Sequence, residues 1–174
     1  MSGLQAEFDW CRRRDDAVRL GRLFADNLTP SYISHAELQG PRALDPATWS
    51  PDIGAILEED LTSRVDQPLD AAAGEKTRLL ACARVGGDFA AVSLVSFSRS
   101  APVAYAEIED MVVVAGARGQ GIGRAFMNWI AEQAKRRGIK RLFLESGVTN
   151  THAHEFFEEI GFHQVSLVMM KSLP

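Results

Sequence analysis

The chain has 174 residues, of which 46% are hydrophobic, and its formal net charge is −4 at pH 7. This length and composition predict one globular domain with a sizeable core, spanning residues 1–174. The acidic balance argues against a nucleic-acid-binding surface, which needs a basic stripe, and modestly favours a cationic substrate such as an amine.

The N-terminus and the two cysteines narrow the class of protein further. Gln5, Glu7 and Asp9 do not fit a signal peptide, and no stretch approaches the roughly 18 apolar residues of a membrane span. We therefore expect a cytoplasmic protein without a membrane-spanning segment. Cys11 and Cys82 are too few and too far apart to predict a metal site, so we expect buried free thiols.

The first half of the chain predicts a strand, two helices and a hairpin. The strand is expected at residues 6–12, and Asp15 or Asp16 caps the helix that follows, which closes at Thr29 and Pro30. A proline-rich loop then precedes a helix at about residues 51–65, and residues 66–75 form a surface turn. Residues 79–85 and 89–97 are expected to pair as an antiparallel hairpin around Gly86 and Gly87.

The second half alternates strands and helices. We expect a strand at residues 103–114, a helix from Ile122, a strand at 141–145, a helix at 150–160 and a last strand at 164–171. The order β-α-α-β-β-β-α-β-α-β predicts an α+β fold. Its sheet is mixed and mostly antiparallel, is flanked by helices, and contains one parallel crossover.

A glycine-rich run joins the strand at 103–114 to the next helix. Gly119, Gly121 and Gly123 remove the Cβ atoms that would keep backbone N–H groups away from an anion. The helix that starts at Ile122 then presents its positive N-terminus to the same point, with Arg118 and Arg124 nearby. The run therefore predicts a pyrophosphate-binding loop.

The spacing of this loop excludes two phosphate-binding families. A Walker A loop needs Lys followed by Ser or Thr after its last glycine, but Ile122 follows Gly121 and Arg124 follows Gly123. A dinucleotide fingerprint needs a glycine at the sixth position counted from Gly119, and that position is Arg124.

Two motifs together resemble the GNAT N-acetyltransferase superfamily. The segment Arg118-x-x-Gly121-x-Gly123 is similar to its acetyl-CoA pyrophosphate motif. About 25 residues later, the segment from Asn150 to Phe162 resembles its Asn-x-x-Ala-x-x-Phe-Tyr-x-x-x-Gly-Phe pattern. The resemblance implies a GNAT-like fold with splayed central parallel strands, and acetyl-CoA as cosubstrate.

The resemblance also implies which residues hold the cosubstrate. The pantetheine arm would bond to the strand backbone, the pyrophosphate would lie on the loop, Asn150 would contact the pantetheine, and Phe157 would lie beside the thioester. The implied set is Met111, Val112, Val113, Arg118, Gly119, Gln120, Gly121, Ile122, Gly123, Arg124, Asn150 and Phe157. The alternative for the side chains of Met111 and the valines is ordinary core packing.

Transfer of an acetyl group to an amine requires a base, because an ammonium must lose a proton before it attacks. A carboxylate suits this role if burial raises its pKa toward neutrality. By the resemblance, Glu109 matches the acidic position that serves as base in several family members, and strand alternation places it on one face with Glu107. A surface carboxylate is the alternative for both residues.

One position departs from the family. Many members carry a Tyr that protonates the leaving thiolate, whereas this chain has Phe157, which has no proton to give. The thiolate would leave unassisted or take a proton from water or another donor. This departure keeps open an acyl-CoA-binding sensor with weak catalysis.

The acceptor is also an expectation from the resemblance. The motif segments look most like those of transferases for small primary amines, with acetylation of a protein Lys or N-terminus as an alternative. The acceptor site would involve residues 28–44, which otherwise read as a solvated loop. The resemblance further implies that a homodimer can form.

Overall fold

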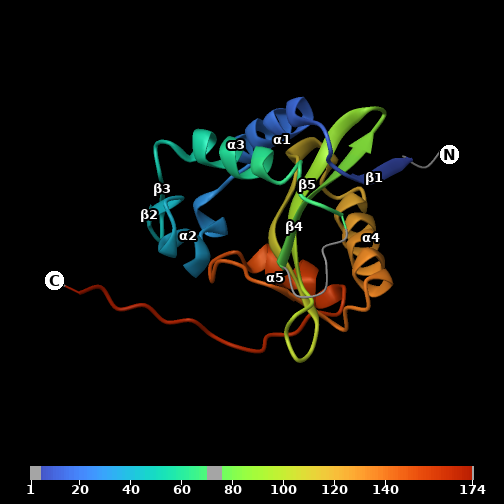
Figure 1. Cartoon of the computed structure of the whole chain (residues 1–174). Helices are drawn as coiled ribbons and strands as arrows, with labels where there is room; N and C mark the ends of the chain where they lie inside the picture. The colour runs from blue at the N-terminus through green and yellow to red at the C-terminus, as the bar shows by residue number, and fades with distance from the viewer. Residues whose placement is uncertain (1–4, 70–75, 174) are drawn as a thin grey trace. The chain divides into compact units, whose positions relative to one another are not determined.

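The computed structural model describes residues 5–69 and 76–173, so part of the predicted turn at 66–75 lies outside the described residues. The strands are β1 (Ala6–Trp10), β2 (Ala43–Asp45), β3 (Thr48–Trp49), β4 (Lys76–Val85), β5 (Asp88–Ser98), β6 (Tyr105–Val113) and β7 (Arg141–Leu144) (Figure 1). The helices are α1 (Arg14–Asp26), α2 (His35–Gln39), α3 (Ile53–Ser63), α4 (Ile122–Arg136) and α5 (Thr151–Glu159), with 3-10 turns η1 (Pro30–Tyr32) and η2 (Ala115–Ala117).

The chain divides into two compact units. Within the described residues, the first unit comprises 5–28, 51–69 and 76–145, and the second comprises 29–50 and 146–173. The first unit holds the large sheet with α1, α3 and α4, and the second holds α2, the β2–β3 pair and α5. The expectation of a single domain stays a prediction.

The sheet of the first unit has the order β1-β4-β5-β6-β7. Its strands pair antiparallel except for β6 and β7, which run parallel on either side of the crossover through α4. Gly86 and Gly87 turn the β4–β5 hairpin with φ values of 60° and 88°, which residues with a side chain rarely adopt. The predicted mixed, mostly antiparallel sheet is confirmed.

Helices cover both faces of this sheet (Figure 1). The side chains of α4 pack on one face, where the rings of Phe126 and Trp129 meet Phe8 of β1. The guanidinium of Arg137, just after α4, lies 5.3 Å from the Trp10 ring and 5.0 Å from the Phe97 ring. On the opposite face α1 and α3 pack against each other. The core of this unit therefore lies in two layers of side chains, one between the sheet and α4 and one between the sheet and the α1–α3 pair.

The first helix begins earlier than its predicted cap. The N-cap of α1 is Arg13, and Asp15 and Asp16 lie inside the first turn. A carboxylate in the first turn still favours the positive end of the helix. Asp16 also binds Arg84 of β4, with 3.0 Å between carboxylate and guanidinium, so its side chain serves a tertiary contact.

The second unit contains two differences from the predicted elements. Residues 29–50 form η1, α2 and the β2–β3 pair, where the prolines predicted a loop. Residues 164–171, predicted as a strand, pair with no strand among the described residues, and that prediction is wrong. Val165, Leu167 and Met169, whose spacing predicted the strand, are exposed. An alternating apolar pattern forms a strand only where a neighbouring strand supplies hydrogen bonds.

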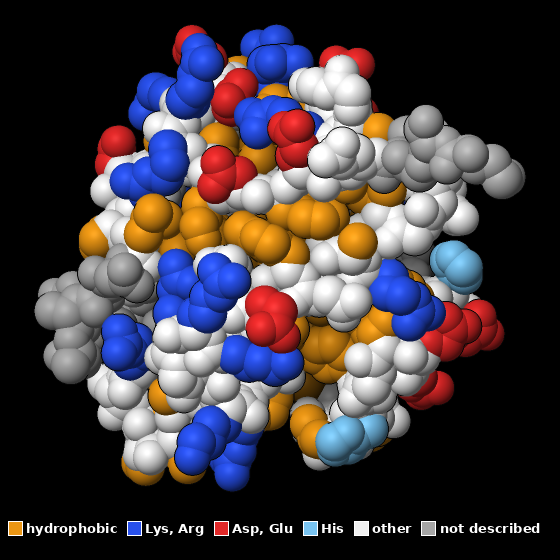
Figure 2. Space-filling model, turned by 90° about the vertical axis from the view of Figure 1, so that its right-hand side faces the viewer, with side chains coloured by type: hydrophobic (Ala, Val, Ile, Leu, Met, Phe, Trp, Pro, Cys, Tyr) orange, Lys and Arg blue, Asp and Glu red, His pale blue; other side chains and the backbone are white. Residues whose placement is uncertain are grey.

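Charged and apolar side chains share the surface. Figure 2 shows apolar side chains forming a band across one face of the molecule, with Lys, Arg, Asp and Glu side chains on either side of it. Across residues 5–69 and 76–173, no helix combines the length and apolar character needed to cross a lipid bilayer.

Both cysteines are buried free thiols, as predicted. Burial raises the pKa of the Cys82 thiol to about 12 and also raises the pKa of Cys11. Because the thiolate is the reactive form, we expect a thiol reagent to label the folded protein at least about 100-fold more slowly than the unfolded protein. Labelling rates in buffer and in denaturant measure this difference, and equal rates would contradict the burial.

Candidate active site

The glycine-rich loop adopts the shape that its sequence predicted. After β6 the chain forms η2 and then turns through Gly119 and Gly121, whose φ values are 73° and 79°. Gly121 is the N-cap of α4, a helix of 15 residues. No atom lies within 4 Å of the point where a Cβ would project at either glycine, so the left-handed backbone is what requires glycine here. The N-terminal amides of α4 have no intrahelical partners and form an anion-binding end.

Side chains of the loop fix its own backbone. Arg118 Nε donates to the Val113 carbonyl at 2.9 Å, and Gln120 Nε2 donates to the Gly116 carbonyl at 2.7 Å. The backbone N–H of Ala115 donates at 3.1 Å to Oδ1 of Asn27, the residue that follows α1. These contacts hold the loop in place before any ligand binds, so two of the predicted cofactor residues also have a structural role.

The strand before the loop is paired unequally along its two edges. β6 pairs with β5 as far as Val113, but its ladder with β7 ends at Ile108 and Leu144. Beyond that point β7 does not cover the edge of residues 109–113. The ladder with β7 therefore does not extend to Met111 and Val113, and the splay that the resemblance implies for the parallel strands stays a prediction. The burial of β6 alternates along the strand, as predicted.

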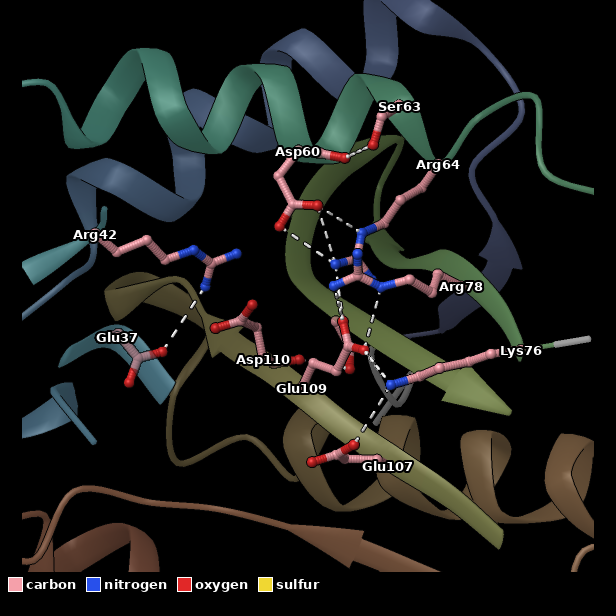
Figure 3. A network of polar contacts seen from close by, with 11 residues as sticks. Glu37, Arg42, Asp60, Ser63, Arg64, Lys76, Arg78, Glu107, Glu109 and Asp110 are labelled. Carbon is pink, nitrogen blue, oxygen red and sulfur yellow. Dashed lines mark hydrogen bonds and ion pairs between the residues drawn. The ribbon is translucent and has the colours of Figure 1, made fainter. Parts of the chain in front are cut away.

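Glu109 is the centre of an ion-pair cluster on the α1–α3 face of the sheet (Figure 3). Its Oε2 lies 2.8 Å from Nη2 of Arg64, which follows α3, and 3.0 Å from Nη2 of Arg78 on β4. Lys76 Nζ lies 3.6 Å from Oε1. Asp60 of α3 binds the same Arg64 guanidinium at 3.0 Å. The Arg64 side chain is 2% exposed and that of Glu109 is 15% exposed.

The backbone at Glu109 is irregular. Val95 of β5 pairs with Ile108, whereas the adjacent Leu94 pairs with Asp110. Glu109 is therefore the extra residue of a β-bulge in β6. A bulge re-aims a side chain relative to its strand, and here the side chain of Glu109 points toward the cluster (Figure 3).

The pKa of Glu109 is shifted downward, whereas the role of general base needs a pKa raised toward neutrality. Burial alone would raise it, but Arg64 and Arg78 more than offset burial through charge and hydrogen bonds, and they lower the pKa from 4.5 to about 2. The condition that a general base needs, a pKa raised toward neutrality, is therefore not met. The two arginines that lower the pKa come from other elements of the fold.

The second motif lies in the second unit. Asn150 is the N-cap of α5, and its side chain makes no capping hydrogen bond, while its carbonyl accepts from Ala153 and His154. Phe157 packs against Phe156 and Phe162, with ring centroids 5.3 Å and 5.9 Å apart. Phe157 is half-buried, and no residue within α5 is fully buried. The predicted helix at 150–160 is confirmed as α5.

Comparison with known proteins decides the family. The sequence profile of the acetyltransferase (GNAT) family matches residues 44–162, which is more than half of the chain. The chain belongs to this family. The match includes the glycine-rich loop, the Glu109 cluster and the Asn150–Phe162 segment of this GNAT protein.

Named relatives match over parts of their length. Streptothricin acetyltransferase of Streptomyces lavendulae is 36% identical over 53% of this chain and 49% of its own length. The aminoalkylphosphonate N-acetyltransferase of Salmonella typhimurium is 31% identical over 38% of this chain and 44% of its own length. This GNAT chain thus spans less than half the length of these relatives.

A solved structure gives the fold alone. The ribosomal-protein-alanine N-acetyltransferase of Brucella melitensis biovar Abortus superposes with a TM-score of 0.63 at 15% identity, covering 97% of this chain and all of that one. At this level of identity the likeness carries the architecture and says nothing of the acceptor.

Sequence reasoning missed the partners of Glu109. Arg64, Arg78 and Lys76 lie between 31 and 45 residues before it, and they come from a helix end and a strand that the sequence does not place beside β6. The Arg78 and Lys76 positions alternate along one strand, which is the only pattern that could have indicated a shared polar face.

Proposed function

We propose that this GNAT chain transfers the acetyl group of acetyl-CoA to a primary amine of a small molecule. The observation that carries the proposal is the glycine-rich loop, in which two left-handed glycines lead from the end of β6 into the N-terminus of α4. Such a terminus binds phosphate groups through backbone N–H groups and the helix dipole.

The proposed cosubstrate site uses backbone more than side chains. Met111, Val112 and Val113 would supply N–H and C=O groups to the pantetheine arm, and Asn150 and Phe157 would contact it farther along. The pyrophosphate would lie on the remaining residues, which are Arg118, Gly119, Gln120, Gly121, Ile122, Gly123 and Arg124. Arg118 and Gln120 support this loop from within through their bonds to backbone carbonyls.

The proposed reaction is a direct attack. The neutral amine forms a bond to the thioester carbonyl carbon, the C–S bond breaks, and the products are an amide and CoA thiolate. One proton leaves the attacking nitrogen, and the thiolate takes one up, from water in the absence of a hydroxyl at Phe157.

The role of Glu109 as base now rests on the resemblance alone. A carboxylate with a pKa of about 2 is a far weaker base than one poised near neutrality. A primary amine has a pKa of about 10.4, so bulk water already maintains a small neutral fraction that can attack without an enzymatic base. In that case Glu109 would act by positioning the β6 backbone through Arg64 and Arg78.

Support for a small-molecule acceptor comes from two relatives, which are named for streptothricin and for aminoalkylphosphonates. Phe157 favours a second candidate, a CoA-binding sensor with weak catalysis, because it removes a proton donor. Homodimer formation and a cytoplasmic location remain predictions, and light scattering tests the first of them.

The test is CoA-thiol release from acetyl-CoA with polyamines, aminoalkylphosphonates, aminoglycosides, amino acids and Lys peptides. We expect release with one class of small amine, and release with Lys peptides alone would replace the small-molecule proposal. Binding of acetyl-CoA without release to any acceptor would favour the sensor.

The same assay with Glu109→Gln tests the base. If Glu109 takes the proton, the variant loses about 10²-fold or more in turnover and the acid limb of its pH profile disappears. From the low pKa we expect instead that kcat/KM follows the ionisation of the amine in both proteins. Circular dichroism at the assay temperature confirms that the variant is folded.

A further inference from the structure

Gly147 occupies a place in the second unit where any side chain would force the neighbouring backbone to shift. A Cβ built on it would lie 2.3 Å from the carbonyl oxygen of Ser31 and 2.5 Å from that of Ile33. Real Cβ atoms do not approach backbone oxygens so closely, and a backbone carbonyl cannot rotate away as a side chain can. The segment after β7 and the backbone of residues 31–33 therefore meet with no side chain between them.

The two segments joined at Gly147 carry different parts of the proposed site. The Gly147 carbonyl accepts the backbone N–H of Asn150 at 2.9 Å, so Gly147 belongs to the turn that starts α5 and presents the proposed pantetheine contact. Ser31 and Ile33 belong to residues 29–50 of the same unit, which overlap the stretch 28–44 that the resemblance implies for the acceptor. The contact at Gly147 thus joins the turn before Asn150, on the acetyl-CoA side, to residues 31–33, on the acceptor side.

A hydrogen bond joins the two ends of segment 29–50. Trp49 Nε1 donates to the Thr29 carbonyl at 3.2 Å. Inside it, Ser34 N and Oγ donate to Oε2 of the buried Glu37 at 2.8 Å and 2.7 Å, closing a capping box at α2. Arg42 Nη1 lies 3.8 Å from Oε1 of the same carboxylate (Figure 3).

We propose that Gly147 is a positioning residue that seats segment 29–50 on the Asn150 turn, so that bound acetyl-CoA orders the acceptor side of the site. This inference rests on the proposed function. A backbone-to-backbone contact has no side-chain freedom to absorb a shift, so ordering of the Asn150 turn by ligand is passed to residues 31–33. Binding that orders a shared segment lowers the cost for a second ligand.

Hydrogen exchange of the wild-type chain tests the coupling without a variant. With CoA as the probe and its binding followed by calorimetry, amide exchange of residues 29–50 should slow by about tenfold or more when CoA binds. Unchanged exchange in the presence of bound CoA would overturn the inference. Failure of CoA to bind at all would overturn the proposed function, which is a separate result.

The variant Gly147→Ala adds a kinetic readout. It should raise the KM of the acceptor about tenfold or more, leave kcat within a few-fold, and abolish the effect of CoA on exchange in segment 29–50. Gly54→Ala is the matched control, because no atom lies within 4 Å of its Cβ position and its φ is not left-handed. Equal acceptor KM values for the two variants would contradict the role of Gly147.

Discussion

Glu109→Gln is expected to lower the free energy of unfolding by about 3 kcal/mol at neutral pH, which follows from the displacement of its pKa from 4.5 to about 2. Removing one partner of a buried pair is costly because the remaining charge loses its compensation. Arg64 is 2% exposed, and its Nη1 already lacks a partner among the described residues. Urea denaturation measures the change.

The same variant should change how stability depends on acid. The folded-state pKa of Glu109 is depressed, so its contribution is fully present above about pH 4.5 and is lost as the pH falls toward about 2. Without this carboxylate, the wild-type loss of stability across that window becomes shallower.

Glu107→Gln is the matched control for this prediction. Glu107 lies two residues away on the same strand, its side chain is 38% exposed, and its contact with Lys76 is 4.0 Å long. Exposed pairs of this kind contribute about 0–1 kcal/mol. If the two variants lose the same stability, the cluster does not hold Glu109 as described.

Gly121→Ala should weaken binding of acetyl-CoA by about 5- to 30-fold, because a side chain at a left-handed position costs roughly 1–2 kcal/mol and turns the N-terminal amides of α4 away from the anion. The φ of Gly121 is 79°, and nothing crowds its Cβ position. The change therefore acts through the backbone and not through a clash. Calorimetry with acetyl-CoA measures the affinity.

The other end of the same helix offers the control. Gly138 follows α4, its φ is 74°, and its Cβ position is equally open. Gly138→Ala should cost a similar amount of stability and leave the affinity for acetyl-CoA unchanged. A parallel loss of affinity in both variants would show that general destabilisation, and not the loop, is responsible.

Local patterns predicted the parts of the fold that depend on neighbouring residues. The Gly86-Gly87 turn, the alternation of β6 and the loop before Ile122 follow from backbone freedom and from periods of two and 3.6, and each is present. Residues 164–171 show the limit of such reasoning. Their apolar pattern is typical of a strand, but pairing depends on a partner edge that the pattern does not contain.

The candidate site shows the same division. The turn from the glycine-rich loop into α4 could be predicted, because the conformational freedom of glycine belongs to the residue itself. The pKa of Glu109 could not, since its sign is decided by Arg64 and Arg78 from other elements. The role of Gly147 could not be predicted either, because the carbonyls that crowd its Cβ position belong to Ser31 and Ile33, more than 110 positions earlier in the chain.

The ion-pair cluster also bears on the order in which the protein assembles. Asp60 and Arg64 form a neutral i,i+4 pair at the end of α3 before any other segment is present. The sheet supplies a second neutral set, with Lys76 and Arg78 from β4 opposite Glu107 and Glu109 from β6. Each half therefore carries its own counter-charges when the helix docks, and no folding step has to bury Arg64 as an isolated ion.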